Sequence, residues 1–419
     1  MKPTIIHYSI LWVLATLPSL TEASEQDVVE KWIQGARERN ADLWKVRAQY
    51  EAALARVPQS GSLPDPRVDF ESLITEPLGP SQKLTIAQPF PWPGTLRHQD
   101  NKASLEALAL WHLVQAMELR VVSSIRIHSA TIVFLHRQKK LLGSNLTLLQ
   151  KQLTVLDEQA RTGGAVGESI RLEMESKLLE DSIASVEERM EREKIRLEEI
   201  TGSEVSIGGL EDLAELIPLP LAFGREGSRG DLLTVNPLVQ ASQARLDAAR
   251  EGFILARLAS YPEFSVGAGY RRFVAPPGGG SGDATDQAVV MISVSLPIWE
   301  GKNQGLRDEA TALIEAAVQE KESIRRAVQA EMDALISRYR DAVRSAELYQ
   351  AEIIPRARQA HEIVESGYRS AKSTYLDVLD AMRTVLDAET AYWRSVADAD
   401  ITRAEIDALF GTEIQNNKP

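Results

Sequence analysis

The chain has 419 residues, 44% of them hydrophobic, so it can bury an extensive core. It contains no cysteine, which excludes disulfides, thiolate catalysis, cysteine-based metal sites and a lipid anchor on an N-terminal cysteine. The formal net charge of -13 argues against nucleic acid as a partner, because phosphate binding requires clustered lysines and arginines.

The N-terminus has the pattern of a secretory signal peptide, which we expect to span residues 1–23. A short, weakly basic start precedes an apolar run from Ile10 to Leu17, and Ala23 offers a small residue for cleavage. No later stretch has about 18 consecutive apolar residues, so we expect no transmembrane helix in the mature chain. Any membrane-spanning part must then consist of strands.

The second half of the chain repeats the plan of the first at an offset of roughly 200 residues. In each half, a helical pattern leads to two strand-like segments, a Pro/Trp/Gly sequence, a very long helical pattern, a turn and a returning helix. We expect a first repeat over residues 24–202 and a second over residues 232–411. An irregular equatorial connection over residues 203–231 joins them, and residues 412–419 form a polar tail.

In the first repeat, the pattern predicts a helix from about Asp27 to Val57, and then strands at about 66–74 and 82–90. A long helix follows from Thr95 to about Ala160. At 1.5 Å per residue it would reach on the order of 100 Å, which indicates coiled-coil packing. The returning helix stops at Gly202, since glycine is the favoured residue for a helix end.

The second repeat predicts the same elements in the same order. Its long helix begins at about Lys302, and Pro355 within it should kink or break it. The returning helix stops at Gly411. The preceding elements are a helix over about Pro237–Ala259 and strands over about 262–273 and 287–296.

Apolar residues alternate with small or polar residues along the predicted strands, most clearly from Phe264 to Tyr270. Strands of about ten residues with this alternation suit a membrane barrel, whereas one such hairpin alone suits a soluble sheet packed on a helix. Four strands cannot close a barrel, because small closed barrels need about eight, and an open sheet edge cannot lie in lipid. A lipid-facing sheet in this chain would therefore require oligomerisation.

This duplicated plan resembles the outer-membrane efflux proteins of the TolC-like family over nearly the whole mature chain. The Leu63–Pro66 and Phe90–Gly94 runs most resemble its heavy-metal cation efflux branch. The motifs that carry the resemblance are Gln88-Pro-Phe-Pro-Trp-Pro-Gly94, Leu296-Pro-Ile-Trp-Glu-Gly301, Tyr368, and Asp377-Val-Leu-Asp-Ala381.

The resemblance implies a mixed α and β fold that is mainly α. Long coiled-coil hairpins would form a periplasmic α-barrel, and each subunit of a homotrimer would lend four strands to a twelve-stranded outer-membrane β-barrel. It further implies a passive duct in a tripartite efflux or type I secretion-like system of a Gram-negative bacterium. The expected partners are outer-membrane lipid, a periplasmic adaptor (membrane fusion protein) and an inner-membrane pump, and we expect no cofactor.

The second helical turn is the candidate pore constriction by the same resemblance. Asp377 and Asp380 match pore-facing aspartates, and Tyr368 matches a tyrosine that holds the tip closed. Lys372 and Ser373 stand where the family often has an arginine, so the closing contacts should differ. Residues three apart on a helix are neighbours, so a trimer would gather six carboxylates. The alternative is that both aspartates are solvated residues near a helix N-terminus, where acids are favourable anyway.

The strand-to-helix junctions have an expected mechanical role, because proline fixes φ and lacks a donor where a strand must bend into a helix. The tryptophans at these junctions are either aromatic anchors at the membrane interface or packing residues. The junction residues are Pro89, Pro91, Trp92, Pro93, Gly94, Pro297, Trp299 and Gly301.

No catalytic or metal-binding pattern stands out. Four histidines, His98, His112, His128 and His136, lie on one predicted helix without metal-ligand spacing, and we expect them to be structural. No nucleophile elbow, P-loop or dinucleotide fingerprint is present, which argues against an enzyme such as a secreted hydrolase. The alternative to a duct is a periplasmic coiled-coil adaptor or scaffold, but an adaptor should have one long hairpin inserted into compact β domains.

Overall fold

The computed structural model describes residues 20–73, 81–161, 166–207, 234–273, 285–370 and 372–411. Within these residues the chain is mainly helical with four strands, so the predicted fold class is confirmed at that level. Most of the predicted signal peptide and equatorial connection, and the whole predicted tail, lie outside the described residues. The predicted cleavage after Ala23 falls within the first helix and stays a prediction.

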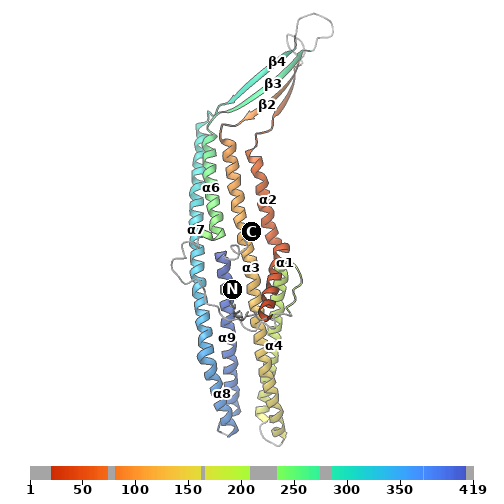
Figure 1. Cartoon of the computed structure of the whole chain (residues 1–419), viewed down its shortest axis with the longest axis vertical. Helices are drawn as coiled ribbons and strands as arrows, with labels where there is room; N and C mark the ends of the chain where they lie inside the picture. Colours follow the sequence, from red (N-terminus) through yellow and green to blue (C-terminus); the bar gives the residue numbers. More distant parts are fainter. Residues whose placement is uncertain are drawn as a thin grey trace, which may run out of the picture. The chain divides into compact units, whose positions relative to one another are not determined.

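Eight α-helices and four strands occupy the described residues (Figure 1). The strands are β1 (Arg67–Leu73), β2 (Ser81–Phe90), β3 (Glu263–Phe273) and β4 (Gln287–Ser295). The helices are α1 (Leu20–Arg39), α2 (Ala41–Gly61), α3 (Thr95–Arg161), α4 (Val166–Thr201), α6 (Pro237–Leu258), α7 (Glu300–Leu348), α8 (Ile354–Arg369) and α9 (Tyr375–Phe410). None of these helices combines the length and the apolar character that a membrane crossing requires.

Two predicted helices are interrupted. The helix expected over Asp27–Val57 is divided at Asn40 into α1 and α2. The side-chain amide of Asn40 donates a hydrogen bond to Ile200 O at 2.9 Å. The second long helix contains a π-helical turn at Tyr349–Ile353, which ends two residues before Pro355. A widened turn there fits a proline that has no N–H for the carbonyl four residues earlier.

Both returning helices end as the sequence predicts. Gly202 and Gly411 follow them with φ of 65° and 64°, in the left-handed region that glycine adopts without a steric penalty.

The chain divides into two compact units, and each takes segments from both sequence repeats because α3 and α7 contribute to both. The hairpin unit comprises Met1–Asn40, Ser124–Leu219 and Tyr339–Ala404. The sheet unit comprises Ala41–Ser123, Pro220–Arg338 and Glu405–Pro419.

The core of the hairpin unit has a seven-residue period. Its buried apolar residues come from α3, α4 and α9 and recur at the interval typical of coiled coils. They are Leu135, Leu142 and Leu149 of α3, Leu172, Leu179 and Val186 of α4, and Tyr375, Leu379 and Met382 of α9.

The sheet unit contains one antiparallel sheet in the order β1-β2-β3-β4. Directly paired residues of neighbouring strands share a face, so the register shows on which face of the sheet each side chain lies. Val68, Ile86, Ala268 and Val290 form one row across all four strands, and the rows on either side of it are also largely apolar.

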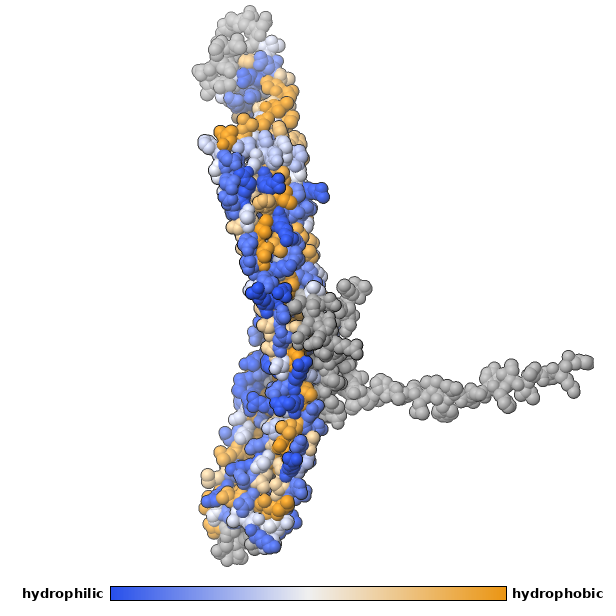
Figure 2. All heavy atoms as spheres, turned by 90° about the vertical axis from the view of Figure 1, so that its left-hand side faces the viewer, coloured by the Kyte–Doolittle hydropathy of each residue, from blue (hydrophilic) through white to orange (hydrophobic). Residues whose placement is uncertain are grey.

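This apolar face of the sheet is exposed. Val68, Phe70, Val290 and Ile292 are 63 to 79% exposed, and Figure 2 shows apolar side chains gathered over the sheet. A soluble hairpin packed on a helix would bury these residues, so that alternative is wrong for the described part of the chain. An exposed apolar face of this extent marks a membrane or protein contact.

Candidate functional site

The turn between α8 and α9 is built around one carbonyl. Gly367 O accepts hydrogen bonds from the backbone N–H groups of Ser370, Lys372 and Ser373 at 3.2, 2.8 and 3.3 Å. A Cβ at Gly367 would lie against Ser373 Oγ, so a larger residue there would require the serine hydroxyl to rotate away. Lys372 shapes the turn through its backbone, and its side chain is exposed.

Asp377 belongs to a reciprocal cap at the start of α9. Its Oδ2 accepts hydrogen bonds from the Thr374 backbone N–H at 2.8 Å and from Thr374 Oγ1 at 2.7 Å. The Asp377 N–H in turn donates to Thr374 Oγ1 at 3.3 Å. This is capping-box geometry, and the hydroxyl bond of Thr374 followed by its backbone bond lowers the pKa of the Asp377 carboxyl. The side chain remains exposed.

Tyr368 packs inward, across the turn. Its ring meets that of Tyr375 edge-on with centroids 5.5 Å apart; Tyr375 belongs to the core cluster of the hairpin unit, and the half-buried Tyr368 packs against that cluster. The Tyr375 hydroxyl hydrogen-bonds Gln152 Oε1 of α3 at 2.7 Å. Burial raises the pKa of both phenols, and the charge of Glu168 on α4 adds to this, so both stay neutral.

Asp380 lies one helical turn beyond Asp377 and is also exposed. Three residues further on, Arg383 makes a two-pronged contact with Glu175 of α4, with Nε 2.9 Å from Oε1. Glu175 has a side chain only 13% exposed, so this pair joins α9 to α4 at the edge of the core. The hydrogen bond to Glu175 chiefly raises the pKa of Arg383, and the charges of Glu175 and Asp380 add to this.

The structure thus separates the predicted site residues. Asp377 and Asp380 share the exposed side of α9, whereas Tyr368 is half-buried against the core and Lys372 lies in the turn. The sequence interpretation missed Thr374, although its spacing from Asp377 is that of a capping box. It also missed the pairing of Glu175 with Arg383, for which no local pattern exists because 208 residues separate them.

The two strand-to-helix junctions differ. Trp92 stacks on Tyr261 at 4.8 Å and on Phe264 at 5.9 Å, which favours the packing role over a free interfacial anchor. Gly94 has φ of 96° and therefore needs glycine. In the second junction Trp299 is 72% exposed, and a Cβ on Gly301 would meet nothing within 4 Å.

Two of the four histidines of α3 join it to other helices. His98 Nδ1 lies 2.6 Å from Glu251 Oε2 of α6, and His128 Nδ1 lies 2.6 Å from Glu193 Oε2 of α4. Among the residues that the structure describes, no group of three or more His, Asp and Glu side chains could hold a metal ion.

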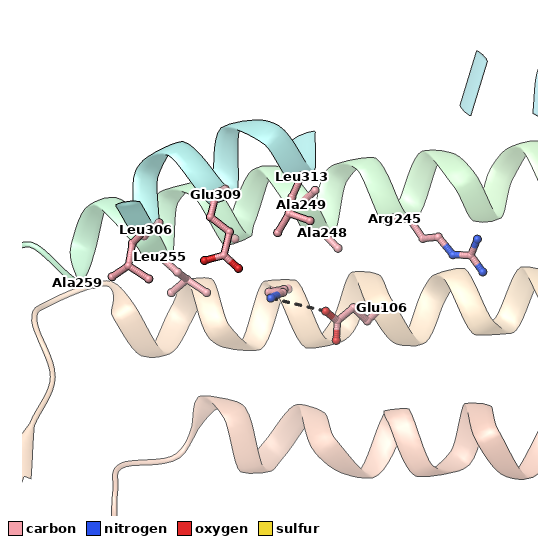
Figure 3. Close-up of a pocket in the computed structure, with 13 residues that line it drawn as sticks. Glu106, Arg245, Ala248, Ala249, Leu255, Ala259, Leu306, Glu309 and Leu313 are labelled. Carbon is pink, nitrogen blue, oxygen red and sulfur yellow. Dashed lines mark ion pairs between the residues drawn. The ribbon is translucent and has the colours of Figure 1, made fainter. Parts of the chain in front are cut away.

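A groove in the sheet unit lies between α3, α6 and α7 (Figure 3). Alanines and leucines line most of it, Lys102 pairs with Glu106 at 3.8 Å on α3, and the Glu309 carboxylate points into it. The small side chains of α6 create this groove, and its lining suits packing rather than chemistry.

Comparisons with known proteins agree on one family. Residues 229–412 match the family model of the outer membrane efflux proteins. The cobalt-zinc-cadmium resistance protein CzcC of Cupriavidus metallidurans is 28% identical over 178 residues, which cover 42% of this chain and 40% of CzcC. The outer membrane protein TolC of Vibrio cholerae is 22% identical over an alignment that covers 96% of this chain and 94% of TolC.

A solved structure shows the same fold. VceC, an outer membrane protein of Vibrio cholerae, superposes with a TM-score of 0.76 at 18% identity, covering 94% of this chain and 99% of that one.

The duplicated hairpins and the four-stranded sheet define a chain of the TolC-like fold. The match of residues 229–412 to the outer membrane efflux proteins and the likeness to CzcC and TolC agree with the sequence resemblance.

Proposed function

We propose that three copies of this chain form a passive duct through the outer membrane of a Gram-negative bacterium. The main observation behind this proposal is that one face of the sheet is exposed and apolar over all four strands. An open edge is not tolerated in lipid, so neighbouring copies would pair their edge strands into a closed twelve-stranded barrel. The helices would continue as a tunnel in the periplasm, and the duct would perform no catalysis.

An inner-membrane pump and a periplasmic adaptor would deliver the cargo. CzcC is named for resistance to cobalt, zinc and cadmium, and this likeness supports divalent metal cations as the cargo class. The alternative of a periplasmic adaptor is disfavoured, because the described chain has two long hairpins and a four-stranded sheet.

Asp377 and Asp380 would form the acidic constriction of this duct. Both are exposed and lie three residues apart on α9, so three subunits would place six carboxylates around one opening. Rings of acidic side chains favour cations. Tyr368 would act indirectly, by packing against Tyr375 and setting the position of α9.

Fractionation, sizing in detergent and planar-bilayer recording test the proposal in sequence. We expect the mature protein in the outer membrane, as a trimer, and conducting. A soluble periplasmic location or a monomer in detergent would contradict the proposed duct. The double variant Asp377→Ala/Asp380→Ala should raise single-channel conductance or weaken cation preference. Unchanged values would contradict the assignment of these residues to the constriction.

A further inference from the structure

The two edge strands of the sheet correspond to its two central strands. β1 and β3 each follow a helix of 21 or 22 residues, whereas β2 and β4 each lead into a long helix, α3 or α7. Short motifs align these strands. Leu63-Pro-Asp65 stands before β1 where Tyr261-Pro-Glu263 leads into β3. Pro89-Phe90 ends β2 where Pro297-Ile298 follows β4. The chain pairs β2 with β3, but β4 and β1, the corresponding strands, lie at opposite edges of its sheet.

The central β2–β3 contact buries residues whose counterparts at the two edges are exposed. On the face opposite the apolar one, the buried residues of this contact are Thr85 and Ala87 of β2 and Gly267 of β3. Their counterparts in the alignment are exposed, namely Ser293 and Ser295 of β4 and Asp69 of β1. The central strands have a neighbour on each side, whereas each edge strand has one. The edges therefore leave open the contact that the centre of the sheet makes.

The junctions beside these strands show the same asymmetry. Trp92, which follows β2, stacks on Tyr261 and Phe264 at the start of β3. Trp299 is its counterpart after β4 and is 72% exposed. Leu63 is the counterpart of Tyr261 and is 47% exposed, although it is apolar. One chain thus carries both halves of a second tryptophan contact, one half at each edge of its sheet.

We propose that β4 of one copy pairs antiparallel with β1 of a second copy in the register that β2 and β3 adopt within the chain, and that Trp299 packs against Leu63 of that second copy. This inference rests on the proposed duct and names the surface through which its copies join. Within the chain, Gln88 is opposite Val266. The same register between copies places Leu296 opposite Val68, Ser295 opposite Asp69, and Ser293 opposite Glu71.

This register keeps both faces of the sheet continuous across the interface. Val68 and Phe70 of β1 come opposite Leu296 and Val294, and all four side chains are exposed and apolar. A shift by one residue would place Val68 opposite Ser295 and so mix the two faces, because successive side chains of a strand point to opposite sides. A shift by two residues would keep the faces, and only the aligned motifs argue against it.

Disulfide cross-linking of the full-length protein tests the register, because the chain has no cysteine of its own. Directly paired residues have Cα atoms about 4.5–5.5 Å apart, within reach of a disulfide. Asp69→Cys/Ser295→Cys and Glu71→Cys/Ser293→Cys should therefore form covalent dimers and trimers with a mild oxidant. Within one copy, β1 and β4 are about 14 Å apart, too far for a disulfide.

The exchanged pairs are the matched controls. Asp69→Cys/Ser293→Cys and Glu71→Cys/Ser295→Cys use the same four positions, but their residues are diagonal neighbours and should cross-link at least about fivefold less. Non-reducing electrophoresis measures all four variants after assembly in the outer membrane. Stronger cross-linking of either exchanged pair would reveal a shift by two residues and overturn the register. No cross-linking in variants that assemble as trimers would overturn the surface, whereas a monomeric wild type would overturn the duct itself.

A double-mutant cycle tests the junction without any cysteine. Trp299→Ala and Leu63→Ala should each lower the temperature at which the trimer dissociates in detergent, and the double variant should lower it little further, since both remove one contact. Ile292→Ala is the control, because Ile292 is equally exposed at 72% but remote from Leu63 along β4. Its effect should add to that of Leu63→Ala. Additive effects of Trp299→Ala and Leu63→Ala would overturn the junction contact and leave Trp299 as a lipid anchor.

Discussion

At the scale of single residues, Asp377 combines a structural and a proposed functional role. Its carboxylate caps α9 through Thr374 and is exposed. A capping acid at a helix N-terminus is favourable by itself, so the geometry alone explains an aspartate here. Asp380 has no part in this cap, which makes it the sharper probe of the proposed constriction.

The cap predicts a pH dependence at the start of α9. Because the hydrogen bonds lower the pKa of Asp377 in the folded chain, its contribution is present above the unfolded pKa of about 3.9 and is lost as the pH falls through the lower folded value. Hydrogen exchange of the first turn of α9 should therefore be faster in Asp377→Asn than in wild type at pH about 5, and this difference should shrink as the pH falls below the unfolded pKa of about 3.9.

Asp380→Asn is the control, since it removes the same charge from the same side of the helix. It should leave exchange in the first turn of α9 unchanged at every pH. A wild-type advantage over Asp377→Asn that persisted at low pH would contradict the role of the ionised cap.

At the scale of elements, α9 is held by contacts with two helices from the other repeat. Tyr375 bonds Gln152 of α3, and Arg383 pairs with Glu175 of α4. Apolar contacts alone would allow α9 to rotate about its axis, whereas these directional contacts fix its orientation.

A double-mutant cycle should find that Arg383 and Glu175 are coupled. Arg383→Ala and Glu175→Ala should each lower the free energy of local opening of α9, and the coupling should be about 1 kcal/mol, since Glu175 is mostly buried. The measurement is native-state hydrogen exchange of α9. The exposed pair Lys177 and Glu180, 2.7 Å apart on α4, is the control and should show less coupling. Equal coupling in both pairs would contradict the prediction.

At the scale of the whole molecule, the sheet joins the two repeats. β2 of the first repeat pairs with β3 of the second over ten residues, from Ser81–Phe273 to Phe90–Phe264. One continuous apolar face results, and the need to close its open strand edges in lipid is the proposed reason for trimer assembly.

Adjacent residues of β4 test which face meets lipid. Ile292→Arg, on the apolar face and 72% exposed, should cost about 2–4 kcal/mol at the bilayer midplane and reduce the fraction of trimer in the outer membrane. Ser293→Arg, on the opposite face, should assemble nearly as wild type. Membrane fractionation followed by sizing in detergent measures both. Equal losses would show that the proposed lipid face is wrong.

Local patterns in the sequence were sufficient for the helices, the strand alternation and the glycine helix ends. Gly202 and Gly411 could be recognised because a left-handed residue after a helix is a local requirement. The break at Asn40 could not, because the contact found there is a hydrogen bond to Ile200, 160 residues away. The cap formed by Thr374 and Asp377 could have been predicted from their spacing, whereas the inward packing of Tyr368 could not.

The sequence by itself determined the strand alternation and the resemblance to a family, since periodicity and motifs are properties of neighbouring residues. Only the tertiary structure decided that β2 and β3 join the repeats and that Lys83 stands opposite Arg271. It also decided that Glu175 holds Arg383. These are pairings between distant segments, and a strand's register depends on its partner as well as on its own pattern.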